Sequence, residues 1–509
     1  MLRSRLVLRV DLRRASNDKA GLTGGHDMTI AEELARRIGT ITFADLPPEA
    51  IAWAKVGILD TVGVTLAGSA EACTRIVSRV AVHSLGPALL FGTSRLVAPL
   101  DAALINGTAA HALDFDDCSN SMGGHPSAPV LPALFALAST RKTSGRDFLA
   151  AYIAGLETET RLARGVNFHH YEKGWHPTAT LGTFGAAAAS THLLGLDARR
   201  TATALSLAAS LTSGIKANFG TMTKPLHVGH ASRNGMMAAL LAADDYTASH
   251  DAFEHRQGFF LVFNGAGNYS AEAVFSDWAA PLDILQPGIA IKQYPCCGST
   301  HPVIDAMLAL VEEHALTPAM VDRVDSWTHA RRLAHTNRPN PTSALDAKFS
   351  VQYCLARALM HGRVMLDHFE GDAYKDRDAQ ALLARIHAAP HPDMSMASID
   401  HFGGEVHVQT KDGRRLSAKV DRPLGRGPEK PLPRSRLEAK FLDCARRALE
   451  PAGTTRVLRM IEKFDELENV GDLAKILIDG YRSQVTRTAD AIAVRSRNDL
   501  SRSAGGNLK

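Results

Sequence analysis

Four short segments of this chain place acids, imidazoles or a lysine beside turn-forming residues. They are Asp114-Phe115-Asp116-Asp117 with the downstream His125-Pro126-Ser127, Gly174-Trp175-His176-Pro177, Thr223-Lys224-Pro225-Leu226-His227, and His301-Pro302. Histidine changes its charge near neutral pH, and a neighbouring carboxylate or lysine shifts the pH at which it does so. The combination predicts proton transfer on a small acidic molecule.

The acidic run follows a helix that is expected to include His111. A solvated turn is the ordinary interpretation of any single aspartate, but three acids in four residues before a glycine-containing loop favour a functional one. The acids lack a recognisable metal-ligand spacing, so we predict no metal. We expect Asp114 to orient a catalytic histidine or to bind a substrate hydroxyl. Asp114 and Cys118 are four residues apart and would share a face if the helix continued.

His125 and His176 are the candidate general base and acid. Two glycines precede His125 and allow the backbone to approach a ligand closely; the alternative is a loop histidine bonded to backbone. His176 precedes a helix expected from Thr178, where the positive helix end lowers a histidine pKa. The alternative for His176 is a structural role packed on Trp175.

The candidate substrate contacts are cationic. Lys224 lies among Gly, Thr and Pro residues, which suits a carboxylate clamp, and the alternative is an exposed loop lysine. Arg233 stands at another expected helix start and would lie at the rim of the site. Lys292 opens a second region, and Cys118 completes the set of predicted substrate contacts.

The second region supplies two further candidates. His301 stands at an expected helix N-terminus, after an adjacent pair of cysteines that cannot easily bridge and do not have a zinc spacing. Tyr353 shares a helical stripe with Phe349, so a core tyrosine is its alternative interpretation.

Composition excludes several classes of protein. The chain has 509 residues, 45% of them hydrophobic, which predicts a soluble globular protein of about two domains. A net charge of +4 and 6% aromatic residues argue against nucleic-acid binding. None of the six cysteines forms a Cys-x-x-Cys pair, which indicates reduced thiols in the cytoplasm. No run of consecutive apolar residues reaches the roughly 18 to 20 that span a bilayer.

Apolar periodicity and small residues predict helices over most of residues 28–283. The clearest are expected at 48–68, 98–111, 178–190, 198–213 and 232–242, with Asp197 as an N-cap. Residues 1–27 are arginine-rich and are expected to be disordered. A transit peptide is a poor alternative, because such peptides contain few acids and this segment contains Asp11 and Asp18.

The pattern changes near Pro281. A strand is expected around 321–327, and 405–410 with 414–420 read as a hairpin around Asp412-Gly413. Helices are expected at 302–314, 348–360 and 378–388. A Pro- and Gly-rich linker covers 423–433, helical periodicity resumes over 435–482, and residues 484–509 form a flexible tail. We therefore predict a mainly α fold: a large helical domain (28–283 and 431–483) with an inserted, smaller α+β lid (284–430).

Four motifs in this order resemble the MmgE/PrpD family. They are Asp-Phe-Asp-Asp with a downstream His-Pro-Ser, Gly-Trp-His-Pro-Thr-Ala-Thr-Leu-Gly, Thr-Lys-Pro-Leu-His-x-Gly, and Tyr-Pro-Cys-Cys-Gly-x-x-His. The resemblance covers about residues 28–482 and implies a homodimer, a site in the cleft between domains, and no metal or organic cofactor. The family's site positions fall on Asp114, His125, His176, Lys224, His301 and Tyr353.

The resemblance also implies a small di- or tricarboxylate substrate. Lys224 would bind its charge, His125 and His176 would transfer protons, and a lid carrying His301 and Tyr353 would close over it. We expect dehydration of a 2-methylcitrate-like acid first, with decarboxylation of a cis-aconitate type or epimerisation of an iminodisuccinate-like acid as alternatives. Cys118 stands where such members commonly carry threonine, and the loop that follows it is short. A metal-dependent hydrolase and a non-catalytic helical binding protein are alternatives from other classes.

Overall fold

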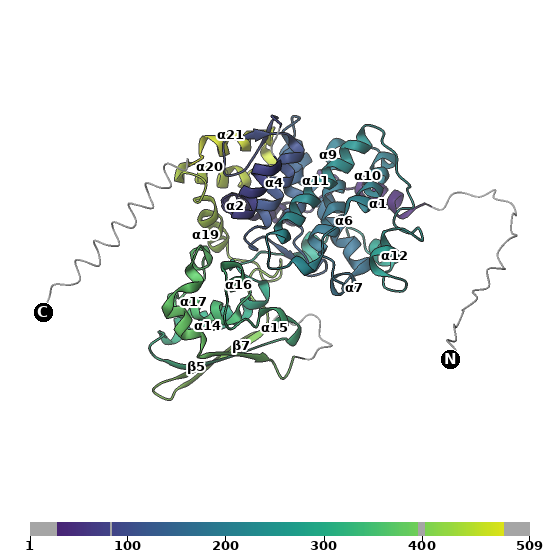
Figure 1. Cartoon of the computed structure of the whole chain (residues 1–509). Coiled ribbons are helices and arrows are strands. Elements are labelled where there is room, and N and C mark those ends of the chain that lie inside the picture. Colours follow the sequence, from purple (N-terminus) through teal and green to yellow (C-terminus); the bar gives the residue numbers. More distant parts are fainter. Residues whose placement is uncertain (1–27, 82–83, 395–402, 483–509) are drawn as a thin grey trace, which may run out of the picture.

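Two large groups of buried apolar residues form the cores of the described chain. The computed structural model describes residues 28–81, 84–394 and 403–482, so the predicted extension 1–27 and tail 484–509 lie outside the described residues. The larger group extends from Ala31 to Ile291 and resumes from Leu437 to Leu477, whereas the second extends from Tyr294 to Val408. The C-terminal helices thus pack back onto the N-terminal ones (Figure 1). The predicted mainly α fold is confirmed.

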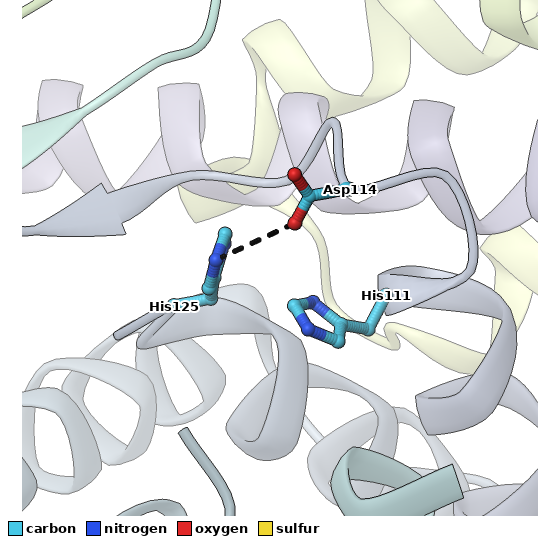
Figure 2. A group of neighbouring side chains, drawn as sticks. All are labelled: His111, Asp114 and His125. Carbon is cyan, nitrogen blue, oxygen red and sulfur yellow. Dashed lines mark ion pairs between the residues drawn. The ribbon is translucent and has the colours of Figure 1, made fainter. Parts of the chain in front are cut away.

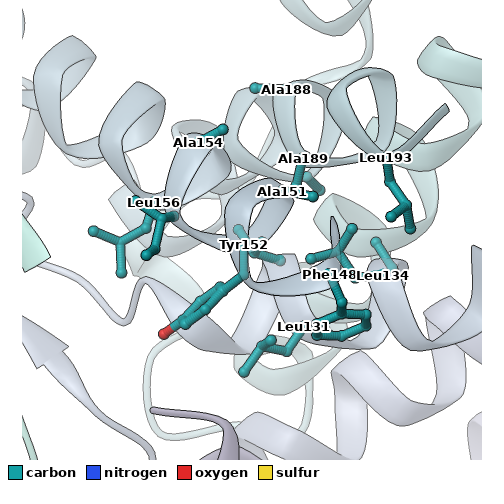
Figure 3. Packing of buried hydrophobic residues seen from close by; sticks show 14 of the residues in the cluster. Leu131, Leu134, Phe148, Ala151, Tyr152, Ala154, Leu156, Ala188, Ala189 and Leu193 are labelled. Atoms are coloured by element: carbon teal, nitrogen blue, oxygen red, sulfur yellow. The ribbon is translucent and has the colours of Figure 1, made fainter. Parts of the chain in front are cut away.

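Helices build most of the larger core. Its longer members are α1 (Ile30–Ile38), α2 (Pro48–Gly68), α3 (Ala72–Ala81), α4 (Pro99–His111), α5 (Ser127–Ala138), α6 (Gly145–Val166), α9 (Gly182–Leu194), α10 (Ala198–Leu211) and α11 (Thr223–Ala243). Its shorter members are α7 (His169–Glu172), α8 (Pro177–Thr180), α12 (Phe259–Asn264) and α13 (Ala271–Phe275). It is completed near the C-terminal end by α19 (Arg434–Ala445), α20 (Pro451–Glu462) and α21 (Gly471–Asp479). Figure 3 shows Leu131 of α5 beside Phe148 of α6, and Ala151 of α6 beside Ala189 of α9.

Small residues let these helices approach closely. A Cβ added at Gly229 of α11 would lie 2.3 Å from the carbonyl oxygen of Leu104 on α4, so the two backbones meet at that point. Local signals also set the helix ends as predicted: Pro48 begins α2, and the Asp197 side chain accepts from Arg200 N at 2.8 Å at the start of α10.

The second core is a sheet covered by helices. Its strands are β5 (Val321–Thr328), β6 (Ile386–Pro390), β7 (Gly404–Thr410) and β8 (Arg415–Val420), in the order β6-β5-β7-β8. β6 is parallel to β5 and the other pairings are antiparallel. The covering helices are α14 (His301–His314), α15 (Ala330–Thr336), α16 (Ala344–Lys348), α17 (Val351–His361) and α18 (Arg377–Leu383). The predicted hairpin is confirmed, with Gly413 at φ +89° in its turn.

Two expected helix boundaries are wrong. The helix expected over 378–388 ends at Leu383, and β6 begins at Ile386, because Ile386 pairs with Val324 of β5. That pairing is a tertiary contact for which the alanine- and leucine-rich sequence carries no strand signal. Likewise α11 begins at Thr223, so Arg233 lies inside this helix and not at a helix start.

Helix α2 is long and apolar enough to cross a membrane by length and mean hydropathy, although the sequence has no unbroken apolar run of that length. In the fold, 72% of its most apolar stretch is buried inside the protein. A core helix passes the same test, and the burial accounts for its apolar character.

Two short pairs of strands complete the described chain. β1 (Ala88–Leu89) pairs with β2 (Leu96–Val97), and β3 (Cys118–Ser119) pairs with β4 (Ile289–Ala290). The second pair joins the loop after α4 to the segment that leads into the smaller core, so it lies at the boundary between the two cores.

Candidate active site

The loop between α4 and α5 forms the floor of the main cavity. Helix α4 ends at His111, and Asp114 adopts a φ of +53°, which few residues other than glycine do. The chain reverses there and enters β3 at Cys118. The helix therefore does not continue, so the condition under which Asp114 and Cys118 would share a helical face is not met.

Three buried lysines hold consecutive carbonyl oxygens of this loop. Lys348 Nζ donates to Leu113 O at 2.6 Å, Lys292 Nζ to Asp114 O at 2.6 Å, and Lys440 Nζ to Phe115 O at 2.8 Å. Two of these lysines come from the segment 292–348 and the third from α19. The loop is thus fixed by parts of the chain that lie far apart in sequence.

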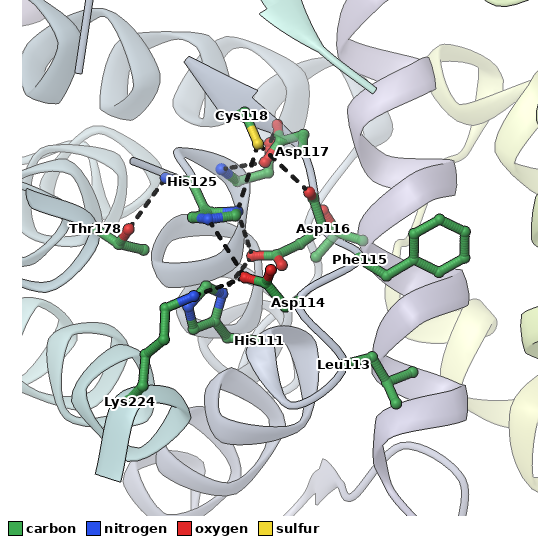
Figure 4. Close-up of polar contacts among 12 residues, drawn as sticks. His111, Leu113, Asp114, Phe115, Asp116, Asp117, Cys118, His125, Thr178 and Lys224 are labelled. Atoms are coloured by element: carbon green, nitrogen blue, oxygen red, sulfur yellow. Dashed lines mark hydrogen bonds and ion pairs between the residues drawn. The ribbon is translucent and has the colours of Figure 1, made fainter. Parts of the chain in front are cut away.

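Asp114 is the anionic centre of the cavity. Its carboxylate accepts from Lys224 Nζ at 2.6 Å and lies 3.1 Å from Lys292 Nζ (Figure 4). Burial raises the pKa of this carboxyl, but the two ammonium groups outweigh burial and hold the pKa well below its usual range. Asp114 therefore stays ionised and fixes the position of both lysines.

Asp116, rather than Asp114, makes the close contacts with the histidines. Its carboxylate lies 2.7 Å from His111 Nδ1 and 3.2 Å from His125 Nδ1, whereas His125 Nε2 is 3.9 Å from Asp114 (Figure 2). Burial lowers the pKa of His125, but Asp116 outweighs burial and raises the pKa to about 10. For His111 burial wins and lowers the pKa to about 4. At neutral pH the two adjacent imidazoles therefore carry different charges.

His176 caps the start of α8 with its ring buried in the cavity wall. Its Nδ1 lies 3.3 Å from His227 Nδ1, and the ring meets the edge of Phe219. Burial lowers the pKa of His176 well below its usual range, so the ring is neutral. Its buried Nε2 has no hydrogen-bond partner among the described residues, which leaves this nitrogen available to a ligand.

The cavity holds about 580 Å³ and has walls from both cores. Asp114, Cys118, His125, His176 and Lys224 line the helical wall, and Lys292 lies where the two walls meet. Seven basic side chains line the cavity against two carboxylates, Asp114 and Glu172. The basic residues are Lys216, Lys224, Lys292, Arg331, Arg332, Arg338 and Arg426.

Three predicted site residues do not line this cavity. Tyr353 is fully buried in the smaller core, where its hydroxyl donates to His368 O at 2.7 Å. His301 is buried against Tyr294, with Nε2 3.4 Å from Cys296 O. Arg233 lies inside α11 and is not among the residues that line the cavity. Tyr353 is therefore surrounded as a core tyrosine would be, which was the alternative interpretation of this residue.

Sequence reasoning missed the smaller core's contribution to the cavity. Arg331, Arg332 and His335 lie on α15, and Cys297 lies in the segment before α14. Arg331, Arg332 and His335 carry no motif, and Cys297 lies in the Tyr-Pro-Cys-Cys-Gly-x-x-His motif from which only His301 was chosen as a candidate. Asp116 was visible too, but which of the neighbouring acids faces the histidines depends on the turn at Asp114.

His111, Asp114 and His125 also form a group that could hold a metal ion, with one ligand atom from each lying within 4.8 Å of the others. The sequence spacing did not predict this group. The donor set fits a cation poorly, since Lys224 and Lys292 already neutralise Asp114 and Asp116 holds His125 as an imidazolium.

Two family models match the chain in succession. The MmgE/PrpD N-terminal domain matches residues 32–272, and the MmgE/PrpD C-terminal domain matches residues 294–466. The two segments correspond closely to the two cores, with the C-terminal match extending into α19 and α20.

Similar proteins come from animals and fungi. Cis-aconitate decarboxylase of Homo sapiens is 30% identical over 462 residues, which cover 88% of this chain and 94% of that protein. Cis-aconitate decarboxylase of Aspergillus terreus is 25% identical over 489 residues, covering 91% and 97%. The mitochondrial 2-methylcitrate dehydratase of Yarrowia lipolytica is 23% identical over 402 residues, covering 73% and 75%.

Proposed function

Since this chain belongs to the MmgE/PrpD family and is an enzyme of the lyase or isomerase type, we propose that it acts on a small polycarboxylic acid without a cofactor. The single observation that carries the proposal is the cavity in which basic side chains outnumber carboxylates seven to two beside a protonated histidine. Such a site binds several carboxylates and supplies a proton where negative charge develops.

We place decarboxylation of a cis-aconitate-like acid first. The similarity to cis-aconitate decarboxylases is higher and covers more of both chains than the similarity to the dehydratase. Dehydration of a 2-methylcitrate-like acid, ranked first on the sequence alone, becomes the second candidate, and epimerisation the third. A homodimer in the cytoplasm belongs to the same proposal.

The reaction would proceed by charge stabilisation and proton transfer. As the bond to the departing carboxylate breaks, its electron pair stays on the substrate and spreads toward a neighbouring carboxylate or double bond. Lys224 and the arginines of α15 would hold the remaining carboxylates and offset the growing charge. The His125 imidazolium lies on the helical wall as a proton donor, and neutral His176 can accept a hydrogen bond from the substrate.

Proton NMR in D₂O of the purified protein with cis-aconitate, 2-methylcitrate and iminodisuccinate tests this proposal. We expect loss of carbon dioxide from cis-aconitate with one deuterium incorporated at carbon. Lys224→Ala should lower kcat/KM at least about 100-fold by removing a cation from the developing charge. Lys411→Ala, in the exposed hairpin turn, serves as the matched control. Turnover of none of these acids by the wild-type protein would contradict the proposal.

A further inference from the structure

The part of the cavity wall that the smaller core contributes carries a second pair of groups suited to proton transfer. Cys297 lines the cavity just before the single turn Gly298–Thr300 that leads into α14. His335 lines it from α15 and lies 3.1 Å from Ser299 Oγ through Nε2. Backbone contacts fix the cysteine, since its N–H donates to Lys348 O at 2.9 Å and its carbonyl accepts from Thr300 N at 2.9 Å.

The surroundings of Cys297 favour its thiolate. Burial raises the pKa of the thiol, but His335 and then Lys292 outweigh burial and Asp114, and the pKa falls to about 7. Burial lowers the pKa of His335, but the Cys297 thiolate outweighs burial and raises the pKa above its usual value. The other titratable groups that feel its charge are Tyr171, Arg332 and Cys354.

The helical wall lacks an effective base at neutral pH. His125 is already protonated, and the pKa values of His111 and His176 are lowered so far that their rings are weak bases. Proton transfer is most efficient when the group titrates near the working pH. Cys297 lines the wall that the smaller core contributes and titrates near neutral pH, so it is the group that can act as this base.

We propose that Cys297, paired with His335 on the wall that the smaller core contributes, is the catalytic residue that exchanges a proton with the substrate carbon. In decarboxylation the Cys297 S–H bond breaks as the new C–H bond forms, and His335 and Lys292 stabilise the resulting thiolate until water returns the proton. In the reverse direction the thiolate removes the same carbon-bound proton. The His125 imidazolium then donates its hydrogen bond or proton to a substrate carboxylate or to the leaving group. This role rests on the proposed function.

The first experiment needs no substrate. The rate of iodoacetamide alkylation of Cys297 is followed against pH by peptide mass spectrometry, which separates it from Cys118 in the same cavity. We expect a midpoint near pH 7 in the wild-type protein and a midpoint shifted upward in His335→Gln. An ordinary thiol midpoint of about 8.5 in the wild-type protein would overturn the proposal.

The second experiment measures exchange and turnover. Incubating the decarboxylated product in D₂O with the enzyme should exchange its carbon-bound proton, and Cys297→Ala and Cys297→Ser should lose this exchange and turnover by about 100-fold or more. Cys73→Ala, a buried thiol on α3 remote from the cavity, is the control. Normal turnover by Cys297→Ala would overturn this role alone, whereas inactivity of the wild-type protein would overturn the proposed function and this role with it.

Discussion

At the scale of the residue, neighbouring side chains of one type behave differently because their partners differ. His111 and His125 both touch Asp116, yet the pKa of one is lowered to about 4 and that of the other is raised to about 10. His111 is more deeply enclosed and feels the positive charges of Lys224 and His125, whereas His125 gains more from Asp116 than it loses on burial. When two neighbouring groups have pKa values this far apart, one can act as an acid and the other as a base at the same pH.

Replacing Asp116 by asparagine should remove the charge that keeps His125 protonated. We expect the pKa of His125 to fall from about 10 toward or below its usual value of about 6.5, and turnover to drop about 100-fold or more.

Because the folded-state pKa of His125 is raised in the wild-type protein, the stabilisation from His125 is fully present below about pH 6.5 and is lost as the pH rises through about 10. Imidazole NMR shifts against pH measure the change, and an unchanged His125 titration would refute this reading.

At the scale of the element, the crossing of α4 and α11 positions the two sides of the Asp114–Lys224 pair. Helix α4 leads into the acidic loop and α11 begins one residue before Lys224. Gly107 and Gly229 face each other at the crossing, where a Cβ on Gly107 would lie 3.0 Å from the Gly229 Cα. Glycine is required here by the close approach of the two backbones.

Gly229→Ala should therefore destabilise the protein. Its new methyl group would lie 2.3 Å from both the Leu104 carbonyl oxygen and the Thr108 hydroxyl, and overpacking of this kind costs about 1–3 kcal/mol. Gly39→Ala is the control, because its methyl group would meet nothing nearer than 3.5 Å and its backbone is right-handed. Urea unfolding followed by circular dichroism compares the two; equal free energies of unfolding would show that the crossing relaxes freely.

At the scale of the whole molecule, the two cores share one cationic cavity. Burial, and next the neighbouring Arg426, lower the pKa of Arg332 to about 9, which means that its charge is disfavoured in the protein without a ligand. A polycarboxylate that contacts both walls would relieve this crowding. Binding should then stabilise the two cores together and weaken as salt screens the charges.

Thermal unfolding with increasing cis-aconitate tests this coupling. A ligand at 100 times its Kd adds about 2.7 kcal/mol to the free energy of unfolding, and we expect a smaller gain for Arg332→Gln and at high salt. Arg415→Gln, on the exposed face of β8, should respond like the wild-type protein. A ligand-induced shift that is unaffected by both Arg332→Gln and salt would contradict a role for the cationic cavity.

The sequence alone predicted much of this protein, because many signals are local. Pro48, Asp197 and Asp412-Gly413 set a helix start, a cap and a hairpin turn within a few residues, and they do so in the structure. The motifs likewise pointed to Asp114, His125, His176 and Lys224, which the fold brings to one cavity. The predicted homodimer, cytoplasmic location and domain boundaries stay predictions.

Only the tertiary structure decided which residues of the smaller core face that cavity. His301 and Tyr353 turn into the smaller core, whereas Cys297 and His335 line the cavity, although Cys297 and His301 belong to one short motif and His335 belongs to none. The same holds for Asp116 and for strand β6, whose roles come from the left-handed turn at Asp114 and from pairing with β5. Contacts between residues far apart in sequence, such as Lys440 on the carbonyl of Phe115, fix these choices, and no short stretch of sequence contains both partners.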